Sequence, residues 1–211
     1  AANCIGGVKY NVNAELLDYM RNMLDKVEPQ VDEIREIYDS NSMVLARTRG
    51  LGLLPKEDAI RLGVVGPVAR GSGLHLDVRK DSPYAAYPDV DFKTVVEQGC
   101  CIHARTMVRL HEIFESFGII RQCIARVPDG EVTAPMRQIR TAEACARSEA
   151  PRGEVFYYIR TNGTDMPARL KWRVPSYMNW EALGVMMRDC NVSDVALITN
   201  SIDPCVSCTE R

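Results

Sequence analysis

The sequence lacks the features that place a protein in a membrane, on a nucleic acid or outside the cell. No apolar run approaches the length of about 18 residues that a membrane-spanning helix needs, and no charged segment leads into a short apolar one as in an export signal. The 26 basic and 28 acidic residues give a net charge of −2, whereas nucleic-acid-binding domains usually carry a basic excess. We therefore expect a soluble globular protein without a nucleic-acid partner.

Phosphate loops and histidine clusters are missing too. Gly63 and Gly66, and likewise Gly71 and Gly73, are not followed by the Lys-Ser/Thr pair of a phosphate-binding loop. The chain has three histidines, and none lies near Cys205 and Cys208 along the sequence. Each is interpreted as structural or exposed rather than as a metal ligand: His75, His103 and His111.

Two long patterns of apolar residues at helical spacing are present. They predict helices over 14–38 and over 92–127. Pro29 lies inside the first pattern, and we expect it to kink that helix or to split it in two. Glycines and prolines alternate between 47 and 87 and predict a long irregular stretch, in which only 55–61 has the character of a helix.

The C-terminal half predicts a small sheet. Aromatic and β-branched residues at 155–159 and 170–174 are typical of two antiparallel strands, and a short helix is predicted over 180–188. A chain of 211 residues, 46% of them hydrophobic, can bury a sizeable core without disulfides. We therefore expect one domain, 1–211, with a mainly α (α+β) fold of two long packed helices, shorter helices, a Gly/Pro-rich segment and a small antiparallel sheet.

Cysteine is the unusual part of the composition, with eight residues. In a chain of this size without an export signal, they argue against a disulfide framework, so we expect free thiols. Free cysteine behaves as a small hydrophobe and is often buried. Four isolated cysteines are accordingly interpreted as core-filling residues: Cys4, Cys123, Cys145 and Cys190.

The only C-x-x-C motif joins Cys205 and Cys208. The turn between two such residues can bring both thiolates onto one metal ion, with zinc as the default metal. Half a zinc site, a redox pair and chance spacing are all open at this point. A redox pair of the thioredoxin type is disfavoured, because such pairs lie near a βαβ unit and start a helix, whereas this one closes the chain. Metal ligation is the favoured interpretation.

Arg152 lies between Pro151 and Gly153, where a predicted strand begins. The proline stiffens the local backbone, and an arginine held in this way suits a fixed contact with an anion or a small polar ligand. The alternative is an ordinary surface arginine in a turn. The residues alone favour that alternative.

Several motifs occur in an order that resembles one family over essentially the whole chain. They resemble the large subunit of membrane-bound, energy-converting nickel-iron hydrogenases, the group that includes formate hydrogenlyase, and the homologous quinone-site subunit of respiratory complex I. The motifs are Ile5-Gly6-Gly7-Val8-Lys9-Tyr10, Arg47-Thr48-x-Gly50, Gly66-Pro67-Val68-x-Arg70-x-Ser72-Gly73, Asp77-Val78-Arg79-Lys80-Asp81-x-Pro83-Tyr84 and Glu149-Ala150-Pro151-Arg152-Gly153-Glu154. The tail Asp203-Pro204-Cys205-x-x-Cys208 resembles the nickel motif of the hydrogenases, whose cysteines the complex I subunit has lost.

The resemblance implies a nickel-iron centre with CN and CO ligands and a role for each site residue. By this resemblance, Cys205 is a terminal nickel ligand, and Cys208 is a thiolate that bridges nickel and iron. Arg152 is the catalytic arginine beside the diatomic ligands of the iron. The pocket around those ligands is completed by Ala150, by Pro151 and by Ser176, whose hydroxyl hydrogen-bonds a cyanide.

The resemblance also implies that part of the site lies outside this chain. The family takes its other two nickel ligands from an N-terminal Arg-x-Cys-Gly-x-Cys, which would precede Ala1, and Cys4 stands alone and cannot replace it. We therefore expect this chain by itself to hold zinc or no metal and to be inactive. Its end at Arg211 resembles the form left when a maturation protease trims the family's C-terminal extension. A carboxylate of the family is missing at Cys100, whereas Arg105 is kept.

The function implied is that of a catalytic large subunit of a membrane-associated nickel-iron hydrogenase, which interconverts H2 with protons and electrons. The expected partners are an iron-sulfur small subunit that takes the electrons, the membrane subunits of the complex, a maturation protease and nickel-insertion proteins. The protein is expected in the cytoplasm, where those partner subunits would attach it peripherally to the cytoplasmic membrane. Two alternatives stay open: a complex-I-like NADH-quinone oxidoreductase subunit with a quinone-binding cleft and no nickel, and an inactive structural fragment.

Overall fold

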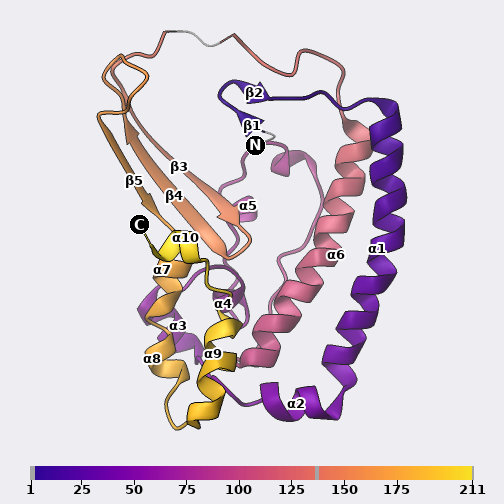
Figure 1. The fold of residues 1–211 in the computed structure, drawn as a ribbon, viewed down its shortest axis with the longest axis vertical. Coiled ribbons are helices and arrows are strands. Elements are labelled where there is room, and N and C mark those ends of the chain that lie inside the picture. Colours follow the sequence, from indigo (N-terminus) through magenta and orange to yellow (C-terminus); the bar gives the residue numbers. More distant parts are fainter. Residues whose placement is uncertain (1–2, 136–137, 211) are drawn as a thin grey trace.

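Two long antiparallel helices dominate the computed structural model, which describes residues 3–135 and 138–210 (Figure 1). α1 (Ala14–Ser40) and α6 (Ile102–Arg126) run side by side along one edge of the molecule. The side-chain oxygen of Asn13 accepts a hydrogen bond from the backbone N–H of Leu16 and so caps α1. Of the two outcomes expected at Pro29, the split does not occur, because α1 continues through this residue.

The second long helix begins at Ile102, later than predicted, because residues 92–101 are not helical. Cys100 has a φ of +55°, which is left-handed and ends any helical run before it. Its backbone N–H donates to the oxygen of Gly71, and its own carbonyl oxygen accepts from the N–H of Leu54. The prediction of a helix over 92–127 is therefore wrong for 92–101, which connects two loops through backbone hydrogen bonds.

The Gly/Pro-rich stretch has more helix than the sequence predicts. The helix expected at 55–61 is confirmed, but it is not alone. Asp77 caps a further short helix by accepting from the N–H of Arg79, and Pro67 starts another. These helices are too short to show an apolar period, so pattern reasoning missed them. The elements here are α2 (Ser42–Thr48), α3 (Lys56–Leu62), α4 (Gly66–Arg70), α5 (Val78–Asp81) and a 3-10 turn (Tyr87–Asp89).

The small antiparallel sheet is confirmed, and it has one more strand than predicted. The expected strands at 155–159 and 170–174 are its second and third members. The first strand has no aromatic or β-branched residue and so gives no sequence signal. It pairs because the turn at Pro151 and Arg152 folds the chain back on itself. The order is β3 (Glu143–Ala150), β4 (Gly153–Arg160) and β5 (Arg169–Arg173), and a separate hairpin joins β1 (Asn3–Cys4) and β2 (Gly7–Val8).

Short helices form the C-terminal part and enclose the core. The single helix predicted over 180–188 is wrong, because one helix ends at Trp180 and another begins at Leu183. These elements are α7 (Pro175–Trp180), α8 (Leu183–Met186), a 3-10 turn (Val192–Asp194), α9 (Val195–Ser201) and α10 (Val206–Thr209). α1 has no buried residue, whereas α6 has several and its first residue, Ile102, belongs to the main core. The most buried members of that core are Leu54, Ala59, Val64, Val68, Ala69, Ala182, Met186, Ile198 and Ile202.

All eight cysteines are free thiols. Cys123 and Cys190, expected to fill the core, are half-buried, whereas Cys4 and Cys145 are exposed. The core interpretation is therefore wrong for the latter two, which lie on the edge hairpin and on the exposed part of β3. Among the described residues, no helix combines the length and the apolar character that crossing a bilayer requires.

We expect Leu54→Ala to lower the free energy of unfolding by about 2–5 kcal/mol, because this side chain is fully buried and leaves a cavity. Its neighbour Leu53 is 48% exposed, so Leu53→Ala is the matched control and should change stability by less than about 1 kcal/mol. Urea unfolding followed by circular dichroism measures both. Equal losses in the two variants would contradict this placement of the core.

Candidate functional site

The sequence-predicted site residues meet where the turn between β3 and β4 approaches the C-terminal segment (Figure 1). Arg152, in this turn, donates from Nε to the backbone oxygen of Asp203 at 2.6 Å and from Nη2 to its Oδ1 at 3.0 Å. Asp203 has a φ of +53°, which aspartate tolerates better than most residues. Arg152 therefore fixes the chain direction just before Cys205. Sequence reasoning missed this contact, although Asp203 stands in the quoted motif.

Two glycines let the β3–β4 turn lie directly on the start of α4. A Cβ on Gly66 would lie 2.3 Å from the backbone oxygen of Arg152, and one on Gly153 would lie 2.6 Å from the backbone nitrogen of Gly66. Both residues also have positive φ values, +66° and +128°, which other residues rarely adopt. A side chain at either position would push the turn, and Arg152 with it, away from α4.

α7 is hydrogen-bonded to α10, the short helix that begins just after Cys205 and contains Cys208. Ser176 is fully buried in α7, and its Oγ accepts a hydrogen bond from the backbone N–H of Cys205 at 2.9 Å. One turn later, Nε1 of Trp180 donates to Oγ1 of Thr209 at 3.0 Å. Sγ of Cys205 lies 3.1 Å from Oγ of Ser207, and the backbone oxygen of Cys205 accepts hydrogen bonds from the N–H groups of Cys208 and Thr209. The C-x-x-C pair is therefore both internally closed and fixed to a neighbouring helix.

The two thiols of the pair differ in acidity. A hydrogen bond from Ser207, at 3.1 Å, and hydrogen bonds from Cys208 lower the pKa of Cys205 to about 7, with a further contribution from the charge of Arg152. Burial raises the pKa of Cys208, and the bond to Cys205 adds to that rise. The thiolate of Cys205, the form that binds metals, is therefore accessible near neutral pH.

The structure thus brings Arg152, Ser176, Cys205 and Cys208 into one region. Ala150 and Pro151 line an adjacent cavity, together with Asp203. Within the ranges 3–135 and 138–210, no group of three or more His, Cys, Asp or Glu residues could hold a metal ion. In the described part of the chain, the two thiols therefore have no further metal-binding side chain beside them. Arg211 lies outside the described residues.

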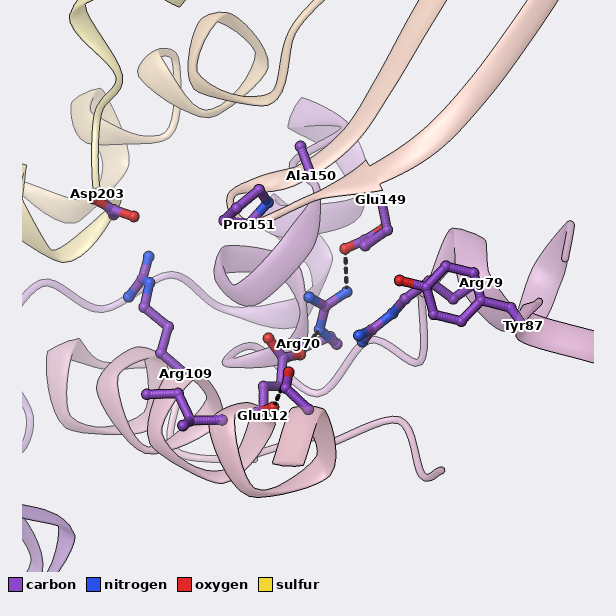
Figure 2. A pocket seen from close by; sticks show the side chains of 11 residues that line it. Arg70, Arg79, Tyr87, Arg109, Glu112, Glu149, Ala150, Pro151 and Asp203 are labelled. Carbon is purple, nitrogen blue, oxygen red and sulfur yellow. Dashed lines mark hydrogen bonds and ion pairs between the residues drawn. The ribbon is translucent and has the colours of Figure 1, made fainter. Parts of the chain in front are cut away.

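A buried ion network joins this region to α4 and α6 (Figure 2). Arg70 and Glu149 stand in the quoted motifs, but sequence reasoning did not predict that they pair. Arg70 is only 1% exposed, and its Nη1 lies 2.8 Å from Oε1 of Glu149 while its Nε lies 2.6 Å from Oε1 of Glu112. Burial raises the pKa of both carboxyl groups, although the charge of Arg70 opposes the rise. Burial also acts on Asp77, but hydrogen bonds from Arg79, one of them 2.7 Å long, outweigh it and lower that pKa.

A second buried arginine anchors the segment before the C-x-x-C pair. Arg105 is fully buried and donates to Oγ of Ser201 from Nε at 3.0 Å and from Nη2 at 2.9 Å. Its Nη2 also donates to the oxygen of Gly52, and its Nη1 to that of Cys100. Cys100, which stands where the resemblance implies a carboxylate, thus meets Arg105 through its backbone. Burial and the charge of Arg109 lower the pKa of Arg105 to about 10.

Comparison with known proteins gives the same family over the whole chain. Residues 1–143 and 136–211 match the family described as the respiratory-chain NADH dehydrogenase 49 kDa subunit. The carbon monoxide-induced hydrogenase of Rhodospirillum rubrum is 52% identical over 213 residues, covering 100% of this chain and 59% of that protein. An NADH-quinone oxidoreductase subunit of Chloroherpeton thalassium is 33% identical, covering 95% and 52%, and an F(420)H(2) dehydrogenase subunit of Methanosarcina mazei is 34% identical, covering 98% and 58%. The chain thus spans little more than half of each relative.

Glu149→Gln tests the buried network through its pH dependence. Because the folded-state pKa of Glu149 is raised above its ordinary value of 4.5, folding takes up a proton at this site. The stabilisation is therefore complete below pH 4.5 and is lost as the pH rises through the raised pKa. We expect the wild type to lose stability relative to Glu149→Gln over that range, measured by urea unfolding at a series of pH values. Glu143→Gln, at an exposed position of the same strand, is the control, and an opposite slope contradicts the prediction.

Proposed function

The chain belongs to the respiratory-chain NADH dehydrogenase 49 kDa subunit family, and we propose that it is part of the catalytic large subunit of a membrane-associated nickel-iron hydrogenase. Such a subunit interconverts H2 with protons and electrons and passes the electrons to an iron-sulfur small subunit. The observation that carries the proposal is the C-x-x-C pair, which Ser176 holds by the backbone of Cys205 and which directly follows the segment that Arg152 fixes at Asp203. The 52% identity to a protein named as a hydrogenase supports it.

The two thiols are ligands of the right chemical type for a nickel-iron centre, but they are only two of the four thiolates that the centre needs. Thiolates are soft ligands that suit nickel and iron, and the lowered pKa of Cys205 favours the ionised form. No third ligand lies with them in the described part of the chain. The proposal therefore takes the other two thiolates from an N-terminal C-x-x-C in the rest of the large subunit, which fits a chain that covers 59% of its hydrogenase relative.

In this proposal, the residues of this chain bind the metal centre and keep its ligands in position. A bound nickel-iron centre with CN and CO ligands supplies the redox metal at which H2 is interconverted with protons and electrons. Cys205 and Cys208 would hold it through Sγ, and the hydroxyl of Ser207, 3.1 Å from Sγ of Cys205, would stabilise the thiolate. Ser176 keeps the Cys205 backbone in place with its buried hydroxyl. Arg152, held by Asp203 through two of its three nitrogens, places a fixed positive charge beside the thiols.

The setting proposed for the large subunit is a multisubunit complex. The relatives named as subunits of NADH-quinone oxidoreductase and of F(420)H(2) dehydrogenase are parts of larger assemblies by their names. We place this chain on the cytoplasmic face of the membrane, against an iron-sulfur small subunit and the membrane subunits. A maturation protease and nickel-insertion proteins would act on it before assembly.

The runner-up function is that of a quinone-site subunit without nickel. Relatives named as NADH-quinone oxidoreductase subunits, at 33–34% identity, favour it. The retained C-x-x-C pair favours the hydrogenase. Elemental analysis of the complete large subunit separates the two, because nickel and iron near one each per protein chain agree only with the first. An inactive structural fragment is the third possibility, and it describes this chain when separated from the remaining ligands.

We expect Cys205→Ser in the complete large subunit to abolish nickel retention and hydrogenase activity. A serine hydroxyl stays protonated near neutral pH and is a hard donor, so it cannot replace a thiolate on nickel. Cys145→Ser, at an exposed position of β3, is the control and should keep the metal. Nickel per protein chain, measured by mass spectrometry, decides the matter. Full nickel in the Cys205 variant rules out the assigned ligand.

Arg152→Lys is expected to keep the metal and to slow hydrogen turnover by about 10²–10³, the usual effect of losing one preorganised donor. Lysine retains the charge but lacks the planar fork with which Arg152 holds Asp203 and faces the site. Arg169→Lys, exposed on β5, is the matched control. Unchanged turnover with unchanged nickel content in the Arg152 variant would remove it from the site.

A further inference from the structure

The three-stranded sheet has one apolar face and one charged face. Successive side chains of a strand point to opposite faces, so the register of the strands decides which residues share a side. On one side, Tyr157 lies between Ala146 and Trp172, and the centres of the two aromatic rings are 6.2 Å apart. This side, the apolar face, is formed by Ala144, Ala146, Tyr157, Ile159, Leu170 and Trp172.

The opposite, charged face is the one that turns toward the chain's own helices. On this face, Glu149 pairs with Arg70 of α4 at 2.8 Å and accepts a backbone hydrogen bond from α5. Arg147 and Arg173 both pair with Glu154 on the same side. An antiparallel sheet commonly packs its apolar face on the core and leaves its polar face to water. Within the described residues, this sheet has the reverse arrangement.

Side chains of the apolar face are accordingly left exposed. Tyr157 is 44% exposed and Leu170 is 42% exposed, and Ala144 and Ala146 are exposed as well. Figure 1 shows the sheet along the edge of the molecule opposite the long helix pair. A sheet with an apolar face must bury that face against another layer. Because charged residues are depleted at the centre of obligate interfaces, an uncharged face of this kind is typical of a permanent contact rather than a transient one.

The apolar face continues onto the helix that is bonded to the C-x-x-C pair. A hollow of about 440 Å³ joins the two, and its lining includes Leu170 and Trp172 of β5 and Tyr177 of α7. α7 is the helix whose Ser176 accepts from the backbone N–H of Cys205. A segment that lies on the apolar face would therefore lead along α7 toward the thiols.

We propose that the apolar face is covered by the rest of the large subunit, through an uncharged segment that packs on the sheet as a second layer. The inference rests on the proposed function, because it takes this chain as part of a longer large subunit. The chain covers 59% of its hydrogenase relative, and the remainder of such a subunit supplies the segment. That remainder is also the proposed source of the other two thiolates. One segment thus covers the sheet and leads toward Cys205 and Cys208.

Hydroxyl-radical footprinting of the complete large subunit, purified without its partner subunits, tests the proposal. Mass spectrometry measures the oxidation of Tyr157 and Leu170 and compares it with that of the same residues in the denatured subunit. Side chains that stay 44% and 42% exposed would be protected only weakly. We expect at least tenfold protection of both, because a covering segment excludes water from them.

Leu170→Glu and Lys171→Glu form a matched pair, because the two residues are adjacent and lie on opposite faces of β5. In the complete large subunit, Leu170→Glu should lower the urea midpoint of unfolding, because it buries a carboxylate without a partner. Lys171→Glu places the same charge on the exposed, charged face and should leave the midpoint nearly unchanged. Equal midpoints in Leu170→Glu and the wild type overturn the proposal.

Three footprinting results overturn it as well. Weak protection in both the complete subunit and the assembled complex leaves the face open to water. Protection that arises only in the assembled complex assigns the face to a partner subunit, and protection that depends on protein concentration assigns it to a second copy. Footprinting of the wild type needs no variant, so it decides even where Leu170→Glu fails to fold. Cys205→Ser should lose nickel and keep the protection, which separates failure of this interface from failure of the proposed metal centre.

Discussion

The guanidinium of Arg70 is the contact on which the placement of the site depends. It ends α4, is almost fully buried, and bonds Glu112 on α6 and Glu149 near the end of β3. Removing one partner of such a buried pair typically costs about 3–5 kcal/mol, whereas replacing the whole group with apolar residues is often neutral or stabilising. The network is therefore better explained by geometry than by net stability. It holds the sheet against α6, so that the turn after β3 faces the C-terminal segment.

Arg70 is linked to the thiols through a short stretch of chain and a few hydrogen bonds. Arg152 follows Glu149 by only three residues, and the Gly66–Gly153 contact prevents the turn from moving away from α4. Arg152 in turn fixes Asp203, while Ser176 and Arg105 hold the same segment from other elements. A segment held from three sides has little freedom, which is what a ligand set with fixed geometry requires.

The elements that the sequence predicts are those with strong local signals. Apolar periodicity predicts α1 and most of α6, and aromatic residues predict β4 and β5. β3 escapes detection because its alanines pair only when the turn folds them onto β4. Residues 92–101 have apolar spacing, yet the left-handed Cys100 and its backbone contacts override it. The motifs contain Arg152, Cys205 and Cys208, and also Arg70 and Glu149, but that Arg70 and Glu149 pair in the fold depends on tertiary contacts, for which one sequence contains no signal.

The same contacts decide which charged groups are available for chemistry. The acidity of Cys205 arises mainly within α10, from Ser207 and Cys208, so the local turn supplies most of the thiolate stabilisation and the fold adds the charge of Arg152. An arginine that already serves a carboxylate has few donors left for a ligand, as with Arg70. Arg109 is bonded only to a backbone oxygen of its own helix and keeps a full guanidinium edge. That edge points toward Asp203, two residues before Cys205, so α6 places a charged group beside the segment that carries the thiols.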